Sequence, residues 1–284
     1  MVYFTLAAVA FLLLAFQWRQ GVHAHSLALV LLTGAAISMA DLFTNALLHL
    51  YVFRPGILPQ PADNFVGVLI AECLFVPSLY GLLALLPPRR RLLASGGIVL
   101  LLIGIEQLFL RLQVYELHGW QTWHTAVAFG AFGMLMGAWA NRFERLGYTG
   151  PRRLTLVAAT VTYLGNLWGV SILSTLQPFR LALHPILSAG HSFHVGSFVV
   201  HGIPFIVAGT AIIWFRQNRT LWQQVLPFFG FWAWMGWLTQ TGVRHLRFAA
   251  EPLGAAIVYT LLIYAAGRID RWYESVTARP ELPS

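Results

Sequence analysis

Residues 92–112 read LLASGGIVLLLIGIEQLFLRL, a stretch of 21 residues with a single acidic side chain, Glu106, towards its end. About 20 consecutive apolar residues in a helix span the hydrocarbon core of a bilayer, so the stretch predicts a transmembrane helix. Comparable runs fill the chain, which is 58% apolar and 10% charged, whereas soluble domains carry about 25% charged residues. The composition predicts an all-α polytopic membrane protein and excludes an ordinary soluble enzyme.

The 284 residues contain about nine such apolar runs, and we expect about nine transmembrane helices. The first run has neither a positively charged start nor a small-residue cleavage site, so we expect it to be a retained helix rather than a signal peptide. The approximate ranges of the runs are 1–18, 26–53, 64–87, 92–112, 120–141, 153–176, 194–215, 221–243 and 252–270.

Charge is distributed unevenly over the connections between these runs. The net charge of +8 comes from 18 arginines and no lysine, against 10 acidic residues. Most of the arginines follow the odd-numbered runs or lie in the tail, so the positive-inside rule predicts an N-terminus outside and a C-terminus in the cytoplasm. The short arginine clusters suit anionic lipid headgroups rather than nucleic acid. The absence of lysine excludes a cofactor held as a Schiff base.

Two parts of the chain look like diverged copies of one four-helix unit. Asp41 corresponds to Asn166, Pro77 corresponds to Pro204, and the register is kept across four predicted helices. Both copies begin on the same side of the membrane, so we expect parallel repeats related by an axis along the membrane normal. The predicted domains are a first helix and loop at 1–25, repeat 1 at 26–148, and repeat 2 with the C-terminal tail at 149–284.

Three acidic residues lie inside apolar runs: Asp41, Glu72 and Glu106. Each costs about 2.5–3.5 kcal/mol at the centre of a membrane helix, so we expect all three to face a shared polar interior. Carboxyl groups in such an interior suit general-acid catalysis, and these three are the candidate catalytic residues. A structural network, in which the same carboxyls hydrogen-bond neighbouring helices, is the alternative.

Further polar and aromatic residues accompany the acids. Ser38, Asp41, Asn45 and His49 follow one another at helical spacing, which predicts a polar stripe along the second run. Arg111 is a possible counter-charge for one of the carboxylates. The candidate substrate-binding residues are Asn45, His49, Arg111, Trp120, Trp123, His124, Asn166 and His201.

Cysteine and histidine patterns give little sign of a metal or cofactor. The single cysteine, Cys73, speaks against disulfides, thiolate zinc sites, iron–sulfur clusters and covalently attached haem. Several histidines of the second half could hold a metal or haem, but no His-Glu-x-x-His or desaturase-type box is present. We therefore expect no metal and no cofactor. The histidines concerned are His184, His191, His194, His201 and His245.

Five short motifs lie within residues 39–148. They are Asp41-Leu42-x-x-Asn45, Phe53-Arg54-Pro55-Gly56-x-Leu58-Pro59, Phe75-Val76-Pro77, Glu106 and Gly119-Trp120. In these motifs the segment resembles a family of small bacterial integral membrane proteins of unassigned function. It is also similar to integral membrane lycopene and terpene cyclases, although the aromatic before the Asp and the second Glu of the cyclase motifs are missing. The resemblance implies a bacterial cytoplasmic membrane protein.

Three functions remain open at this point. The first is an enzyme of the cyclase type that acts on a lipid or isoprenoid by acid-assisted cyclisation or isomerisation; aromatic residues, 14% of the chain, would stabilise a carbocation. The second is a proton-coupled or small-solute transporter. The third is a subunit that binds quinone, haem or pigment. The expected partners are membrane lipids and an apolar small molecule.

The arginine distribution gives a test of topology. A reporter fused after Ser284 should report the cytoplasm, and one inserted in the loop that contains Arg54–Leu58 should report the outside. Enzymatic reporter activity in intact cells measures both positions. If both reporters lie on one side of the membrane, the predicted arrangement of nine helices is wrong.

Overall fold

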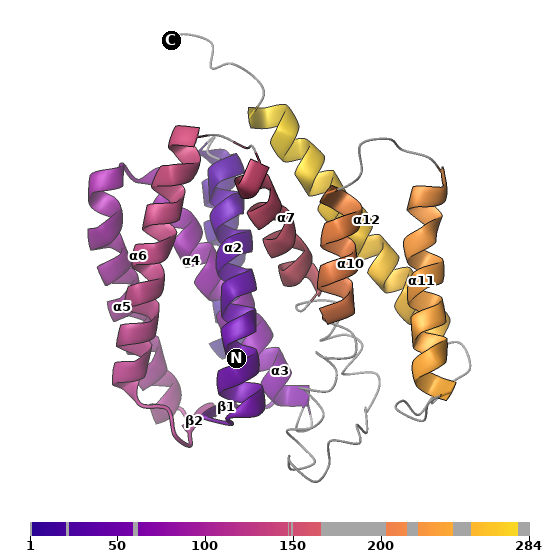
Figure 1. Ribbon diagram of the computed structural model, residues 1–284. Coiled ribbons are helices and arrows are strands. Elements are labelled where there is room, and N and C mark those ends of the chain that lie inside the picture. The colour runs from indigo at the N-terminus through magenta and orange to yellow at the C-terminus, as the bar shows by residue number, and fades with distance from the viewer. Residues whose placement is uncertain are drawn as a thin grey trace. The chain divides into compact units, whose positions relative to one another are not determined.

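The computed structural model is predominantly helical and divides into two compact units, Met1–Thr149 and Gly150–Ser284 (Figure 1). The structure describes residues 2–20, 23–58, 62–146, 148, 150–165, 203–214, 221–240 and 251–277.

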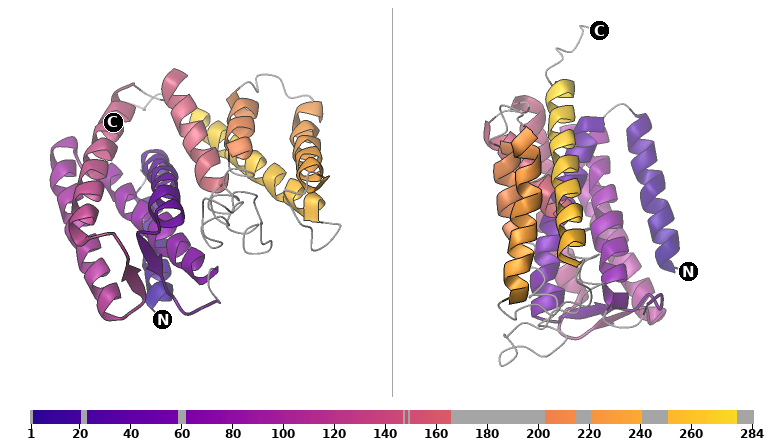
Figure 2. Two further views of the ribbon diagram at one scale, coloured as in Figure 1. Left: turned by 60° about the horizontal axis from the view of Figure 1, so that its bottom comes forward. Right: turned by 90° about the vertical axis from the view of Figure 1, so that its right-hand side faces the viewer.

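Unit 1 is a helix bundle with a small two-stranded sheet at one end (Figures 1 and 2). Helix α5 packs against α6, while α2 packs against α4, α6 and the segment η2, which also contacts α1. Its elements are α1 (Val2–Arg19), α2 (His23–Asp41), η1 (Leu42–Leu47), β1 (Tyr51–Phe53), α3 (Ala62–Val68), η2 (Leu69–Phe75), α4 (Val76–Gly81), η3 (Leu82–Leu85), α5 (Pro88–Arg111), β2 (Tyr115–Leu117) and α6 (Thr122–Leu146).

Four helices in the described part of the chain are long and apolar enough to cross a membrane. They are Val2–Arg19, Ala24–Asn45, Val66–Leu85 and Pro88–Arg111. Large apolar side chains on α1 and α5 point away from the bundle, such as Leu93 with 80% of its surface exposed, as lipid-facing residues do. The expectation of a helical protein with membrane-spanning helices is confirmed in this form, while the number nine and the orientation stay predictions.

Two stretches of π-helix interrupt the α-helices of unit 1. Segment η1 follows Asp41 directly, and η2 contains Glu72 and ends just before Val76-Pro77. Proline has no N–H and its ring clashes with the preceding turn of an α-helix, so the wider π-turns before Pro77 relieve that conflict. Asp41 and Glu72 therefore lie at places where the helical register shifts.

The second helical segment ends earlier than the sequence predicts. The run 26–53 was expected to be one helix, but η1 ends at Leu47, His49 adopts a positive φ of 52°, and Tyr51–Phe53 form strand β1. This strand pairs antiparallel with β2, with Phe53 opposite Tyr115 and Tyr51 opposite Leu117. Because β2 comes from the distant loop between α5 and α6, the pairing could not be recognised from the local pattern.

The opposite end of unit 1 is closed by a buried arginine. Arg91, near the start of α5, donates from Nε to the carbonyl of Leu83 at 2.9 Å and from Nη1 to the side chain of Asn141. The Leu83 carbonyl also accepts the backbone N–H of Leu86, so the guanidinium is its second donor. The two bonds of Arg91 tie α5 to both η3 and α6.

Unit 2 contains α7 (Gly150–Leu164), α10 (Ile203–Trp214), α11 (Leu221–Gln240) and α12 (Glu251–Thr277). Its core includes Val161, Phe205, Phe231 and Tyr259. Asn166, the predicted counterpart of Asp41, lies outside the described residues. The internal repeat therefore stays a prediction.

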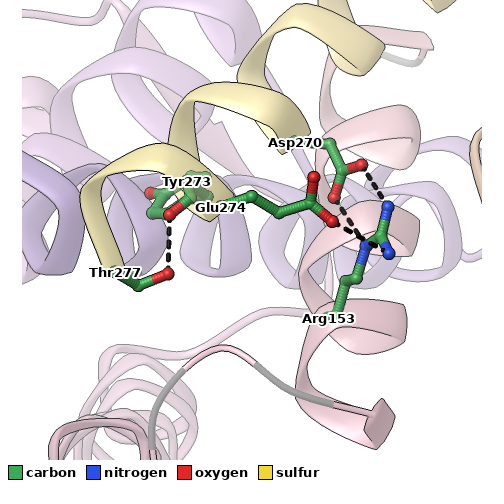
Figure 3. Close-up of polar contacts among 5 residues, drawn as sticks. All are labelled: Arg153, Asp270, Tyr273, Glu274 and Thr277. Atoms are coloured by element: carbon green, nitrogen blue, oxygen red, sulfur yellow. Dashed lines mark hydrogen bonds and ion pairs between the residues drawn. The ribbon is translucent and has the colours of Figure 1, made fainter. Parts of the chain in front are cut away.

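An ion-pair network joins α7 to α12 in unit 2 (Figure 3). The Arg153 guanidinium donates to both carboxylate oxygens of buried Asp270, at 3.1 and 2.8 Å, and its Nη1 lies 2.9 Å from Glu274 Oε1. The Trp214 ring of α10 lies 5.9 Å below the guanidinium carbon. A bidentate pair of this kind satisfies the buried Asp270 carboxylate and fixes the crossing of the two helices.

The close approach of α3 to β1 predicts a sensitive glycine. A Cβ on Gly67 would lie 2.2 Å from the Phe53 Cβ, so Gly67→Ala should lower the stability by about 1–3 kcal/mol, or roughly 3–10 °C in Tm. Thermal unfolding in detergent measures the effect. Gly97→Ala is the matched control, because its Cβ would meet nothing within 4 Å. Equal Tm values for the two variants would contradict the packing of α3 on β1.

Candidate functional site

Unit 1 contains a partly open cavity of about 200 Å³ in the half of the bundle next to the β1–β2 sheet. Its walls come from α1, α2, η1, η2, α4, α5 and α6, and residues of the sheet and of the loop after β2 line it at one end. The lining residues are Leu6, Ala36, Ile37, Ala40, Asp41, Thr44, Tyr51, Phe53, Ala71, Glu72, Phe75, Val76, Leu102, Ile105, Glu106, Phe109, Tyr115, Trp120, Thr125, Ala128, Phe129 and Phe132.

Helical spacing explains which side chains line the cavity. The α6 residues that do so are Thr125, Ala128, Phe129 and Phe132, and α5 contributes its residues 102, 105, 106 and 109 in the same pattern. Residues three and four apart share one face of a helix. Each helix therefore presents one stripe to the cavity, and on α5 the stripe includes a carboxyl group.

The structure brings Asp41, Glu72 and Glu106 to the walls of this one cavity. The first two form a cluster with Tyr51, whose hydroxyl donates to Asp41 Oδ1 at 2.9 Å and lies 3.3 Å from Glu72 Oε2. A phenol has one proton to donate, so the Tyr51 hydroxyl can donate to one carboxyl group and accept a hydrogen bond from the other only if that second group is protonated. The geometry therefore allows this cluster to hold a transferable proton.

Two tyrosines of the sheet remain phenols beside these acids. Burial raises the pKa of the Tyr51 hydroxyl well above its usual value, and the charges of Asp41 and Glu72 raise this pKa further. Burial likewise raises the pKa of Tyr115, with Glu72 the largest of the charged contributors. Because Tyr51 keeps its proton, it acts as a hydrogen-bond donor to the acid pair.

Glu106 forms a second, separate polar cluster. Its Oε2 accepts a hydrogen bond from the Thr125 hydroxyl, and Thr125 Oγ1 accepts one from Trp120 Nε1 at 2.7 Å. Only 8% of the residue's surface is exposed, and Oε1 is buried without a hydrogen-bond partner among the described residues. The Trp120–Thr125 chain therefore fixes the carboxyl group and leaves one oxygen unpaired.

Asn45 lies one turn after Asp41, in η1, and joins this segment to α3. It exchanges amide hydrogen bonds with Asn64, the shorter being 2.9 Å from Asn64 Nδ2 to Asn45 Oδ1. Asn64 Oδ1 also accepts the backbone N–H of Phe53 at 2.8 Å. These bonds connect η1, α3 and β1, so Asn45 is a positioning residue and does not line the cavity.

Several predicted substrate-binding residues lie elsewhere. His49 is exposed and stacks on His118, Arg111 is exposed and pairs with no carboxylate among the described residues, and Trp123 is 57% exposed. His124 contacts Trp120 and Trp123 but does not line the cavity. Of the predicted tryptophans, Trp120 does line it. Asn166 and His201 lie outside the described residues.

Tyr51 contacts Asp41 and Glu72, and Thr125 contacts Glu106, but neither residue is predicted from the sequence as a site residue. Tyr51 lies in a stretch predicted to be helical, and its position depends on the pairing of two strands that are far apart in the sequence. Thr125 was detectable in principle, since it lies one residue after His124 at the predicted start of a helix. A lone threonine in an apolar run, however, carries no distinctive signal.

The cavity lining, as far as the structure describes it, contains acidic side chains without basic ones. Three carboxyl groups line the cavity, and no Arg or His does so among the described residues. Within the described part of the chain, no three His, Cys, Asp or Glu side chains form a group that could hold a metal ion. Arg54 and Glu116 form an ion pair at 2.8 Å, but both side chains are exposed and neither lines the cavity.

Comparison with protein-family models, curated proteins and solved structures gives no match. The resemblance to membrane cyclases therefore stays a prediction.

The bridging position of Tyr51 predicts a loss of stability on removal of its hydroxyl. Tyr51→Phe leaves the acid pair without its donor and should cost about 1.5–3 kcal/mol, a hydrogen bond to charged groups being worth that much. Thermal unfolding in detergent should show the loss in Tm. Tyr264→Phe, at a side chain that is 51% exposed, should change little. A Tyr51→Phe protein as stable as the wild type would argue against the bridge.

Proposed function

We propose that unit 1 is an intramembrane enzyme that acts on a lipid or isoprenoid substrate by acid-assisted isomerisation or cyclisation. The observation that carries the proposal is the single aromatic-rich cavity into which Asp41, Glu72 and Glu106 all project. Carboxyl groups are expensive within a membrane and usually mark a site of function. An apolar wall selects an apolar substrate, and the acids provide the chemistry.

The Asp41–Glu72 pair is the proposed proton donor. One carboxyl group of the pair carries the proton, and the Tyr51 hydroxyl, which contacts both groups, stabilises the carboxylate that remains after the proton leaves. Protonation of a substrate double bond forms a C–H bond and leaves a carbocation on the neighbouring carbon. A positioned acid of this kind commonly accelerates proton transfer by about 10²–10⁴-fold.

Glu106 is the proposed base and cation stabiliser. The Glu106 side chain lines the cavity, and its carboxylate can take a proton from a carbon next to the cationic centre, so that the electrons of that C–H bond form a double bond at a new position. Ring closure before this loss gives a cyclic product instead. Either sequence returns one proton for the one supplied and needs no oxidant or reductant.

The cavity limits the part of the substrate that reacts. An apolar cavity of about 150 Å³ takes up benzene, so about 200 Å³ accommodates a ring with a few additional carbons. A longer lipid would place only its reacting segment inside. Transport across the membrane is less well supported, because the lining residues of α5 and α6 come from one half of each helix.

Deuterium transfer to carbon tests the proposal without a known substrate. Protein in vesicles of bacterial lipid extract, incubated in D₂O, should place deuterium on carbon in an apolar lipid, which mass spectrometry detects. Asp41→Asn and Glu72→Gln keep the shape and hydrogen bonding but remove the acid, so each should lower the incorporation by about 100-fold or more.

The matched control is Glu116→Gln, an acid on β2 that does not line the cavity. It should retain the wild-type rate. Absence of carbon-bound deuterium with the wild-type protein, or full incorporation by both Asp41→Asn and Glu72→Gln, would refute the proton-donor role. Loss of folding in both variants would favour a structural network.

A further inference from the structure

We propose that the cavity binds lipophilic organic cations of one positive charge, such as an aryl or alkyl ammonium ion. The inference rests on the proposed function in that it concerns the same cavity, but it adds a class of ligand. In the enzyme such an ion would imitate the cationic intermediate and act as an inhibitor.

The side chains that line the cavity are unbalanced in charge. The lining contains three carboxyl groups, and the described residues supply no positively charged side chain to balance them. Asp41 and Glu72 share the Tyr51 hydroxyl, whereas Glu106 lies in a cluster of its own. A negative group in an apolar space is stabilised by an opposite charge, so the ligand that complements this cavity carries a positive charge.

The geometry of Glu106 shows where that charge is held. Thr125 occupies Oε2, and Trp120 in turn fixes Thr125, so the carboxyl group cannot turn freely to pair its other oxygen. Oε1 is buried and has no partner among the described residues. A buried carboxylate oxygen without a partner is costly, and a cation in the cavity removes that cost.

The remaining lining favours an organic cation over a metal ion. Phe109 lies one turn after Glu106 on the same stripe of α5, and Phe129, Phe132 and Trp120 line the same cavity. Aromatic faces attract ammonium groups and prefer them desolvated. A metal ion would need several oxygen ligands close together, and the described residues form no such group.

A pair of probes of the same shape separates charge from size. Phenyltrimethylammonium and tert-butylbenzene are isosteric, differ in one positive charge, and match the volume of the cavity. Each is titrated by calorimetry into full-length protein in detergent and into protein-free micelles. The ammonium ion should bind roughly tenfold or more tightly than the neutral isostere.

Glu106→Gln keeps the hydrogen bond to Thr125 but removes the charge, and should weaken ammonium binding roughly tenfold. Glu116→Gln should leave the binding unchanged. If Glu106→Gln does not fold, the wild-type protein still decides the question, because the ammonium ion should raise its Tm and tert-butylbenzene should not. Equal binding of the two probes, or unchanged binding in folded Glu106→Gln, would overturn the inference.

The outcomes also separate this inference from the enzymatic proposal. Ammonium binding without deuterium transfer would support the cation site and count against the chemistry. Deuterium transfer without preferential ammonium binding would support the chemistry and overturn the cation site.

Discussion

The site in unit 1 depends on the hydroxyl of Tyr51, which contacts two of its three carboxyl groups. This hydroxyl joins Asp41, at the end of α2, to Glu72 within η2, and it does so from a strand that belongs to neither helix. Without this hydroxyl, the two carboxyl groups would lie in an apolar bundle and lack the hydrogen-bond partner that they share. Because buried polar groups without partners are costly, the position of β1 and the positions of the two acids determine one another. The sheet is therefore part of the site and not merely a connection at the end of the bundle.

The π-helical segments explain how helices that are otherwise regular can present these acids. An α-helix bonds its backbone carbonyls within the helix, apart from those of its last turn, and it changes direction little along its length. The extra residue in a π-turn shifts the register, and such turns recur at functional sites. Here Asp41 precedes one π-segment and Glu72 lies in the other. The local widening that Pro77 favours thus brings a carboxyl group to the cavity at a backbone position with altered register.

The sequence predicts the helical character, the apolar spans and the three acids, because each of these follows from a local cost or period. The insertion cost of a charge marked Asp41, Glu72 and Glu106 without any knowledge of the fold. The partners of these acids could not be found in this way. Tyr51 reaches them through strand pairing with a loop more than 60 residues away, and local periodicity extended the helix through its position. His49 and Arg111 do not line the cavity, although helical periodicity predicted that they would. His49 follows the end of η1, Arg111 is the last residue of α5, and both side chains are exposed.

A purely structural network accounts for the two acid clusters unequally. It explains Asp41 and Glu72 well, because both carboxyl groups contact the Tyr51 hydroxyl. It does not explain Glu106. If that residue served only to join α5 to α6, a glutamine, or a hydroxyl matching Thr125, would make the same bond at a lower cost of burial. Instead the chain keeps a carboxyl group, fixes one oxygen through Thr125 and Trp120, and leaves the other buried without a partner among the described residues. The cation that we propose as a ligand of this cavity would supply an opposite charge to this group, and the aromatic side chains of the lining suit such a ligand.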